Sequence, residues 1–195
     1  MARPVMLVVA GPPGSGKTMF FPASALGVDA FNIDDRCAQL LGSYRAIPQA
    51  VRSAVSRECE RFVLRHIQDG RSFAVETTLR TLTAARQAEM AAQHGFRTEL
   101  RFLATASPDL NVQRVRQRAY SGGHAASESE IRATYAASVE NLPEATRAFL
   151  RSKVYDTSEP WTRPRLVATA RSGMCDVVLG APDWVVRALG GKPPE

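Results

Sequence analysis

Gly11-Pro12-Pro13-Gly14-Ser15-Gly16-Lys17-Thr18 is the stretch that decides the fold of this chain. It fits the phosphate-binding loop pattern G-x-x-x-x-G-K-[ST], which requires a strand before it and a helix after it. The apolar run of residues 5–10 predicts a strand that is buried on both faces of a parallel sheet. A helix is expected from Thr18 to about Leu26, with Gly27 as its stop.

The spacing of this loop has a chemical explanation. Glycines allow positive φ, so the backbone N–H groups can turn inward and surround phosphate oxygens. The helix that follows adds the positive end of its dipole. Lys17 would reach the β- and γ-phosphates of ATP, and the Thr18 hydroxyl would hold Mg²⁺. The predicted ATP-binding residues are therefore Gly11, Pro12, Pro13, Gly14, Ser15, Gly16, Lys17 and Thr18.

Strand and helix patterns alternate along the rest of the chain, which favours an α/β fold with a parallel sheet. Further strands are expected at 30–33, 72–76, 97–104 and 153–157, and a hairpin at 166–169 and 176–179. Helices are expected from Pro48 to about residue 66, at 82–94, from Ser107, from Ser127 to about Leu150, and at 183–189. Ser127 and Glu130 predict a capping box, and Pro143 predicts an interruption of the helix that follows.

Length and composition favour one soluble domain over residues 1–195. Hydrophobic residues make up 45% of the chain, and no apolar run is long enough to span a membrane. The three cysteines are scattered and lack metal-type spacing, which favours reduced thiols in a cytoplasmic protein. The net charge of +6 comes almost entirely from arginines spread along the chain, so we expect a solvated surface and a phosphate site rather than a nucleic-acid partner.

Polar residues follow two of the predicted strands, at the sheet edge where α/β proteins bind their ligands. Asp34 and Asp35 follow the second strand, and either could orient and deprotonate an attacking hydroxyl or cap the next helix. Glu76 ends the third strand and is a candidate for Mg²⁺ or substrate, with Thr77 and Thr78 beside it as candidates for substrate binding.

A kinase also needs positive charge over the transferring phosphoryl group. Arg114, Arg116 and Arg118 are candidates. Arg114 and Arg118 are one turn apart on one helical face, while Arg116 points elsewhere and is expected to be a surface charge. His124 lies in a Gly-Gly-His loop. It is either a residue of the backbone turn or a residue that acts at the substrate. No Asn-Lys-x-Asp stretch occurs, which disfavours a guanine-specific switch GTPase.

Together these residues resemble the zeta-toxin family of small kinases. The match runs from the phosphate loop through Asn32-Ile33-Asp34-Asp35, Glu76-Thr77-Thr78, Arg114-Val115-Arg116-Gln117-Arg118, Gly122-Gly123-His124 and Asn141-Leu142 to Val154-Tyr155-Asp156-Thr157-Ser158. It covers roughly residues 5 to 158 in the expected order. The compact form with a Gly-Gly-His loop is similar to the chromosomal branch of the family.

The resemblance implies an adenylate-kinase-like sheet flanked by helices, with an arginine-bearing lid at about 114–127. It implies transfer of the ATP γ-phosphate to a hydroxyl of a nucleotide-activated sugar such as UDP-N-acetylglucosamine, and an antitoxin as a possible partner. Asp34 would be the base, Glu76 and Thr78 would position acceptor or metal, and Arg114 fits the first lid arginine. The second lid arginine has no match, and Arg118, His124 and Arg132 are the candidates for its role.

Three other functions stay open at this point. The acceptor could be another small molecule, such as a nucleotide, a cofactor or an antibiotic. The chain could be a nucleotide-binding regulatory module without transfer activity. A polynucleotide end kinase is favoured only by the basic charge.

Overall fold

The structure is a computed structural model that describes residues 3–22, 25–44, 47–120, 126–159 and 162–190. Its strands are β1 (Val5–Ala10), β2 (Asp29–Asn32), β3 (Phe73–Thr77), β4 (Arg97–Ala104), β5 (Arg151–Asp156), β6 (Arg165–Arg171) and β7 (Met174–Val177). Its helices are α1 (Lys17–Phe20), α2 (Ile33–Leu41), α3 (Gln49–Gln68), α4 (Thr83–Gln93), α5 (Pro108–Tyr120), α6 (Glu128–Glu140), α7 (Leu142–Ala148) and α8 (Asp183–Leu189).

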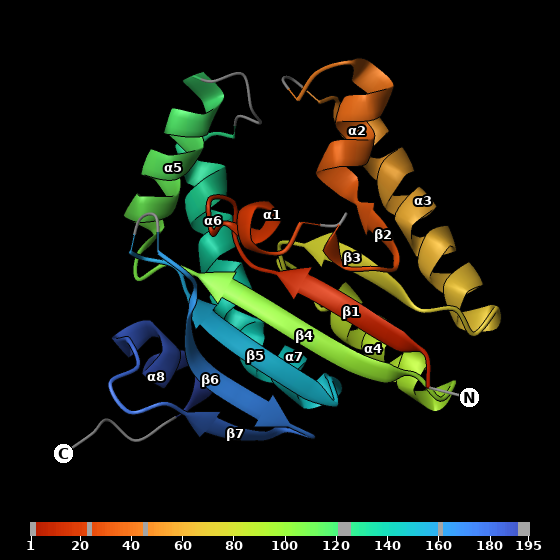
Figure 1. Cartoon of the computed structure of the whole chain (residues 1–195). Helices are drawn as coiled ribbons and strands as arrows, with labels where there is room; N and C mark the ends of the chain where they lie inside the picture. Colours follow the sequence, from red (N-terminus) through yellow and green to blue (C-terminus); the bar gives the residue numbers. More distant parts are fainter. Residues whose placement is uncertain (1–2, 23–24, 45–46, 121–125, 160–161, 191–195) are drawn as a thin grey trace.

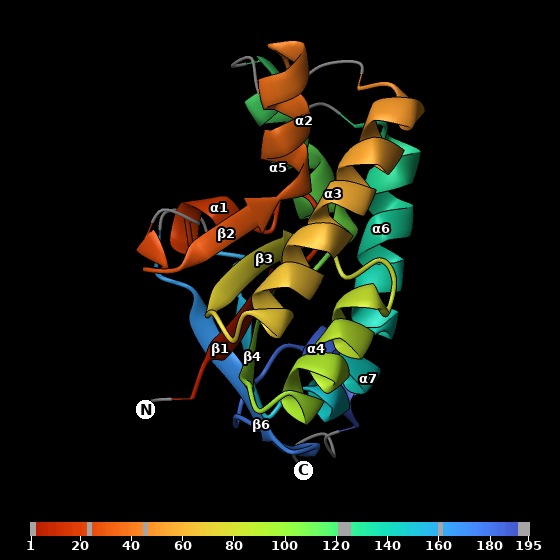
Figure 2. The ribbon, with the colours of Figure 1, turned by 90° about the vertical axis from the view of Figure 1, so that its right-hand side faces the viewer.

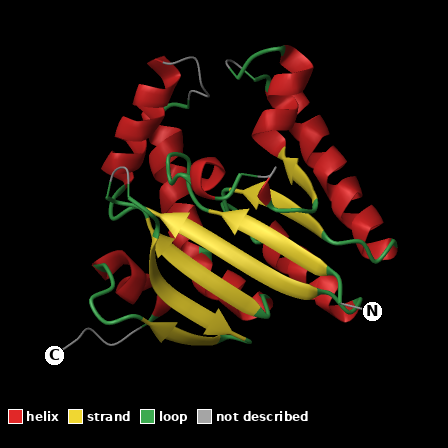
Figure 3. Cartoon of the chain, viewed as in Figure 1, coloured by secondary structure: helices red, strands yellow, loops and turns green. Residues whose placement is uncertain are grey.

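The described strands form one sheet in the order β2-β3-β1-β4-β5-β6-β7 (Figure 3). The first five are parallel, and the β6–β7 hairpin runs antiparallel at one edge. The α/β sheet and the terminal hairpin predicted from the sequence are thereby confirmed. β1 lies between β3 and β4, so the loop that follows it leaves the middle of the sheet.

The main core lies between the sheet and the helices on one of its faces (Figure 2). Alternate residues of β1, Met6 and Val8, are fully buried there with Phe73 and Phe102 of the neighbouring strands. Alanines of α4 let that helix lie close to the sheet. Within the described residues, no helix is both apolar and long enough to cross a lipid bilayer.

Two pairs of helices rise above the carboxyl ends of the central strands, α2 with α3 on one side and α5 with α6 on the other (Figure 1). The phosphate loop and α1 lie at the base between these two arms. A small apolar cluster of Val112, Val115 and Ile131 joins α5 to α6. The fold thus places the loop after β1 where both arms can reach a bound ligand.

Two helix boundaries differ from the sequence prediction. The helix predicted to run to about Leu26 is α1, and it ends at Phe20. Phe21 precedes Pro22, whose ring disfavours the helical conformation of the residue before it. The helix expected from Ser127 to about Leu150 is two helices, because α6 ends before Asn141 and α7 begins with Pro143 in its first turn.

Candidate active site

The phosphate loop has the backbone that its glycines predict. Gly11, Gly14 and Gly16 have φ of 142°, 80° and 84°. A Cβ on Gly11 would lie 2.0 Å from the carbonyl oxygen of Leu103, and one on Gly14 would lie 2.8 Å from that of Asn111. The loop is therefore packed directly against β4 and α5, and only glycine fits at these two positions.

This close packing predicts a large stability effect for Gly11→Ala. The variant would combine the strain of positive φ with a clash against backbone, so we expect a loss of about 3 kcal/mol or more. Gly70→Ala is the matched control, because Gly70 has φ of 63° and a methyl group added there would meet nothing within 4 Å. It should lose about 1 kcal/mol. Urea unfolding of both variants measures the difference, and equal losses would contradict the packing argument.

Lys17 is folded back over this loop. Its side chain is nearly buried, and Nζ donates hydrogen bonds to the carbonyl oxygens of Gly11 at 2.7 Å and Pro12 at 3.2 Å. Burial lowers the pKa of Lys17, and the nearby carboxylates of Glu76 and Asp34 oppose that shift. The lysine is thus held at the mouth of the loop, with carboxylates of two other elements near its charge.

Glu76 and Thr18 form the second part of the site. The Thr18 hydroxyl lies 3.2 Å from both Oε1 and Oε2 of Glu76, and Oε1 is 4.0 Å from Lys17 Nζ. Burial raises the pKa of Glu76, while Lys17 and the Thr18 hydrogen bond lower it. A threonine hydroxyl beside a carboxylate is a pair of ligands that can hold Mg²⁺ together with phosphate oxygens and waters.

Other features of the loop also fit a nucleotide. The Ser15 hydroxyl is fully buried and has no hydrogen-bond partner among the described residues. Asn111 of α5 donates from its amide to the Pro13 carbonyl at 2.5 Å, which fixes the outer part of the loop. The donor set of Lys17, Thr18 and Glu76 therefore fits ATP with Mg²⁺.

Asp34 and Asp35 both lie in the first turn of α2, but neither caps it. The cap is Asn32, whose Oδ1 accepts from the backbone N–H of Asp34 at 2.9 Å and of Asp35 at 3.3 Å. The sequence interpretation that one aspartate caps this helix is therefore wrong, because the residue before the helix already fills that role. Both carboxylates are left for other contacts.

The two aspartates have different partners. Oδ1 of Asp34 accepts from the Arg52 guanidinium at 2.8 Å, and Asp34 lines a large cavity. Oδ1 of Asp35 accepts from the Tyr44 hydroxyl at 3.0 Å, and Asp35 is not among the residues that line this cavity. The geometry favours Asp34 over Asp35 as the residue that meets an acceptor.

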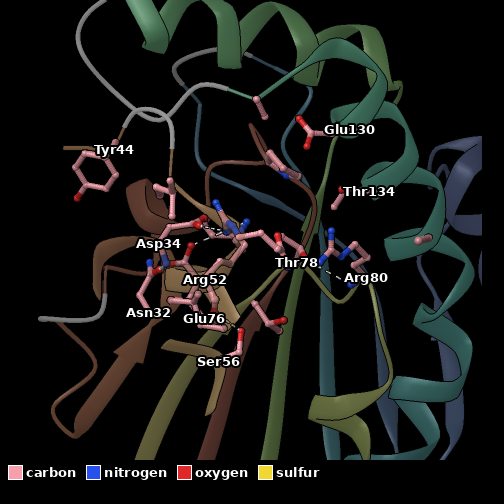
Figure 4. Close-up of a pocket in the computed structure, with 18 of the residues that line it drawn as sticks. Asn32, Asp34, Tyr44, Arg52, Ser56, Glu76, Thr78, Arg80, Glu130 and Thr134 are labelled. Atoms are coloured by element: carbon pink, nitrogen blue, oxygen red, sulfur yellow. Dashed lines mark hydrogen bonds and ion pairs between the residues drawn. The ribbon is translucent and has the colours of Figure 1, made fainter. Parts of the chain in front are cut away.

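This cavity has a volume of about 750 Å³ and lies between the two arms, beside the phosphate loop (Figure 4). Its lining is Pro13, Lys17, Asn32, Ile33, Asp34, Tyr44, Ile47, Gln49, Arg52, Ser53, Ser56, Glu76, Thr77, Thr78, Arg80, Ala126, Glu130, Ala133, Thr134 and Ala137. The predicted residues Lys17, Asp34, Glu76, Thr77 and Thr78 thus come together in one place. The lining is mostly polar and charged, which suits a hydrophilic ligand.

The segment after β3 shapes the middle of this cavity. The hydroxyls of Thr77 and Thr78 accept from the N–H groups of Leu79 at 3.3 Å and Arg80 at 3.4 Å. Leu79 has a positive φ of 58°, and the Thr78 carbonyl accepts from Ser138 of α6 at 2.5 Å. These contacts turn the Glu76–Arg80 segment toward the cavity and hold it there.

Arg114 and Arg118, the two arginines predicted to share one face of α5, differ in their surroundings. Arg114 is half-buried and donates to the carbonyl oxygens of Thr157 at 2.7 Å and Ser158 at 3.0 Å, beside the phosphate loop. Burial lowers its pKa, and Asp156 opposes this. Arg118 is exposed, and its charge lowers the pKa of Lys17. Its side chain is therefore within electrostatic reach of the phosphate loop.

Two other predicted arginines form ion pairs on the surface. Arg116 donates to Glu128 at 2.6 Å on the surface, as its place on the helix indicates. Arg132 pairs with Asp109 at 2.6 Å and with Glu128 at 2.8 Å. These two carboxylates hold Arg132 on the surface, and its role as a substitute for the second lid arginine stays a prediction. His124 lies outside the described residues.

Several lining residues were missed by the sequence analysis. They come from α3, α6 and the loops beside them, and they include Arg52, Arg80, Tyr44, Glu130 and Thr134. Arg52 and Ser56 are one turn apart on α3, so the sequence does show a polar face there. Whether that face meets solvent or a cavity depends on α6, which is far away in the chain.

The phosphate loop and the strands around it match a known protein family. A family model described as an AAA domain matches residues 6–142, from β1 to the start of α7. The chain belongs to this AAA domain family. No curated protein matches the chain.

Solved structures share its fold. In the PezAT chromosomal toxin–antitoxin system of Streptococcus pneumoniae, the matching chain is 19% identical with a TM-score of 0.64, over 100% of this chain and 82% of that chain. AvrRxo1-ORF1:-ORF2 with ATP gives 18% identity and a TM-score of 0.73, over 96% of this chain and 64% of that chain. A putative kinase from Chloroflexus aurantiacus is 19% identical with a TM-score of 0.53, over 68% of this chain and 77% of that chain. The fold expected from the zeta-toxin resemblance is thereby confirmed.

Proposed function

We propose that this chain is one P-loop kinase domain that transfers the γ-phosphate of ATP to a hydroxyl of a small acceptor. The observation that supports this most is the shared cavity, in which Asp34 opens into the same space as Lys17 and Glu76. A phosphate donor and a carboxylate base can therefore meet one acceptor. A nucleotide-activated sugar such as UDP-N-acetylglucosamine is the leading acceptor, because the cavity is large and polar and the fold is that of PezAT.

The residues would divide the work as follows. Lys17 leaves the loop carbonyls and contacts the phosphates, and the loop N–H groups hold the remaining oxygens. Asp34 accepts the proton of the attacking hydroxyl. Thr18 and Glu76 would hold Mg²⁺, which when bound neutralises charge on the phosphates. Thr77 and Thr78 would contact the acceptor from the middle of the cavity.

The proposal is tested by mass spectrometry of a metabolite extract incubated with ATP–Mg²⁺ and the protein. A phosphorylated small molecule that forms with the wild type and not with Lys17→Ala supports the kinase and identifies the acceptor. Loss of ATP without any new phosphorylated product would favour the regulatory module instead. Formation of a phosphorylated oligonucleotide end would favour the polynucleotide kinase.

Closure of α5 over ATP is a separate prediction. Arg114 and Arg118 lie on one face of α5, and the Arg118 charge already reaches Lys17. We expect slower hydrogen exchange of the α5 amides from Arg114 to Tyr120 when ATP–Mg²⁺ and acceptor are added, since a closed arm excludes water. The α8 amides are an internal control. Unchanged exchange in α5 at saturating ligand would argue for a fixed site.

An antitoxin and a cytoplasmic location belong to the same proposal. The PezAT structure is described as a toxin–antitoxin system, and the fold of this chain is shared with it. Co-purification of this protein with the product of a neighbouring gene would test for such a partner. A growth assay in cells that express the wild type or Lys17→Ala would test for toxicity.

A further inference from the structure

Arg52 lies at the boundary between the proposed base and the rest of the cavity. It comes from α3, lines the cavity, and donates from Nη1 to Asp34 Oδ1 at 2.8 Å (Figure 4). The two side chains are 31% and 42% exposed, so the pair stands at the cavity wall rather than in the core. Ion pairs this exposed contribute little to the free energy of unfolding, so we expect the main effect of this pair to be on the position of the Asp34 carboxylate.

The contact holds one oxygen of the carboxylate and leaves the other available. Oδ1 of Asp34 is the acceptor for Arg52, and Oδ2 makes no hydrogen bond to any residue that the structure describes. The backbone of Asp34 is fixed at the same time by the Asn32 cap. With its backbone and one oxygen held, the carboxylate has little freedom to turn away from the cavity.

The charge of Asp34 also acts on other ionisable groups in the site and on its own arm. Burial lowers the pKa of Lys17 and raises that of Glu76; the negative charge of Asp34 opposes the first shift and adds to the second. On its own arm, burial raises the pKa of Cys37 and the hydrogen bond to Asp35 raises that of Tyr44, and the charge of Asp34 adds to both shifts. Hydrogen bonds from Ser127 lower the pKa of Glu130 on the opposite arm, and the charge of Arg52 adds a smaller effect in the same direction.

We propose that Arg52 is a positioning residue that orients the Asp34 carboxylate toward the acceptor hydroxyl. This inference rests on the proposed kinase function. Orientation of a reacting group by a neighbouring side chain is a recognised source of rate, because small displacements of the base lower turnover strongly.

The alternative is that the Arg52–Asp34 pair only links α2 to α3. A second ion pair between the same two helices is a matched control for this alternative. Arg36 of α2 donates from Nε to Glu58 of α3 at 3.0 Å and 3.2 Å, with exposures of 38% and 32%. This second ion pair links the same two helices, and neither of its members lines the cavity. Arg36→Gln therefore removes an equivalent tie without touching Asp34.

The test compares Arg52→Gln with Arg36→Gln in the ATP-dependent extract reaction. We expect Arg52→Gln to lower the apparent kcat by roughly tenfold with the KM for ATP within about twofold, because only the transfer step needs an oriented base. Arg36→Gln should leave both constants unchanged. Arg52→Lys should recover part of the rate, since an ammonium group can still hold one carboxylate oxygen. In an Asp34→Asn background, Arg52→Gln should have little further effect.

The possible outcomes separate the two claims. Equal effects of Arg52→Gln and Arg36→Gln, or a full additional loss from Arg52→Gln in the Asp34→Asn background, would overturn the positioning role while leaving the kinase intact. A KM change without a kcat change would assign Arg52 to ligand binding instead and would also overturn it. If the folded wild type forms no phosphorylated product, the proposed function fails first, and this inference fails with it.

Discussion

Lys17→Ala is expected to lower phosphoryl transfer by on the order of 10²-fold or more, because the lysine supplies positive charge where phosphate charge develops. Folding should be little affected. Lys17 is a nearly buried amine whose pKa is lowered by burial, so its charged form is disfavoured in the folded state. Below its folded-state pKa the buried charge costs stability, whereas the alanine variant also loses the hydrogen bonds to Gly11 and Pro12. The two effects oppose each other, so the unfolding temperature should change little.

The measurement is initial-rate product formation together with thermal unfolding of the same samples. Lys153→Ala is the control, because Lys153 is an exposed lysine of β5. Lys153→Ala should change neither the rate of product formation nor the unfolding temperature. Normal turnover in a folded Lys17→Ala protein would mean that this loop does not act as a phosphate site.

Asp34→Asn should lower turnover by roughly 10²-fold or more and leave ATP affinity within a few fold, as expected for loss of a general base. The substitution isolates the charge cleanly. The cap of α2 is Asn32, and an asparagine oxygen at position 34 can still accept from Arg52. Neither helix capping nor the position of the side chain therefore needs to change.

Asp35→Asn is the control for this prediction and should be mild, because Asp35 contacts Tyr44 and does not line the cavity. Product formation and ATP titration of both variants give the comparison. If Asp35→Asn loses turnover while Asp34→Asn does not, the base is the neighbouring residue. If both transfer phosphate normally, Glu76 becomes the next candidate.

Local patterns allowed much of the fold to be predicted. The positive φ of the phosphate-loop glycines is a local requirement that the motif reveals, and the Ser127–Glu130 capping box depends on one helical turn. Both are present in the structure. The end of α1 at Phe20 is also locally determined, because Pro22 restricts Phe21, and this effect outweighs the helical pattern that continues to Leu26.

The rest of the site depends on contacts between distant segments, which a single sequence does not reveal. Arg114 finds its partners at Thr157 and Ser158, and Arg132 finds one at Asp109. Both side chains are arginines on helices near the predicted lid, and nothing local separates them. Arg52 faces Asp34 only because α3 packs along α2, so its place in the cavity follows from helix packing rather than from any motif.

The two arms are built from separate stretches of the chain, with β3, α4 and β4 between them. The arm of α2 and α3 carries Asp34 and Arg52, while α5 carries the arginines closest to the phosphate loop. Under the proposed function, we expect substitutions at the α3 positions of the cavity lining to change the acceptor without loss of the nucleotide site. A library randomised only at the α3 positions 49, 53 and 56 should yield variants with new acceptors and an unaltered affinity for ATP. Under this proposal, the acceptor can change during evolution while ATP remains the donor.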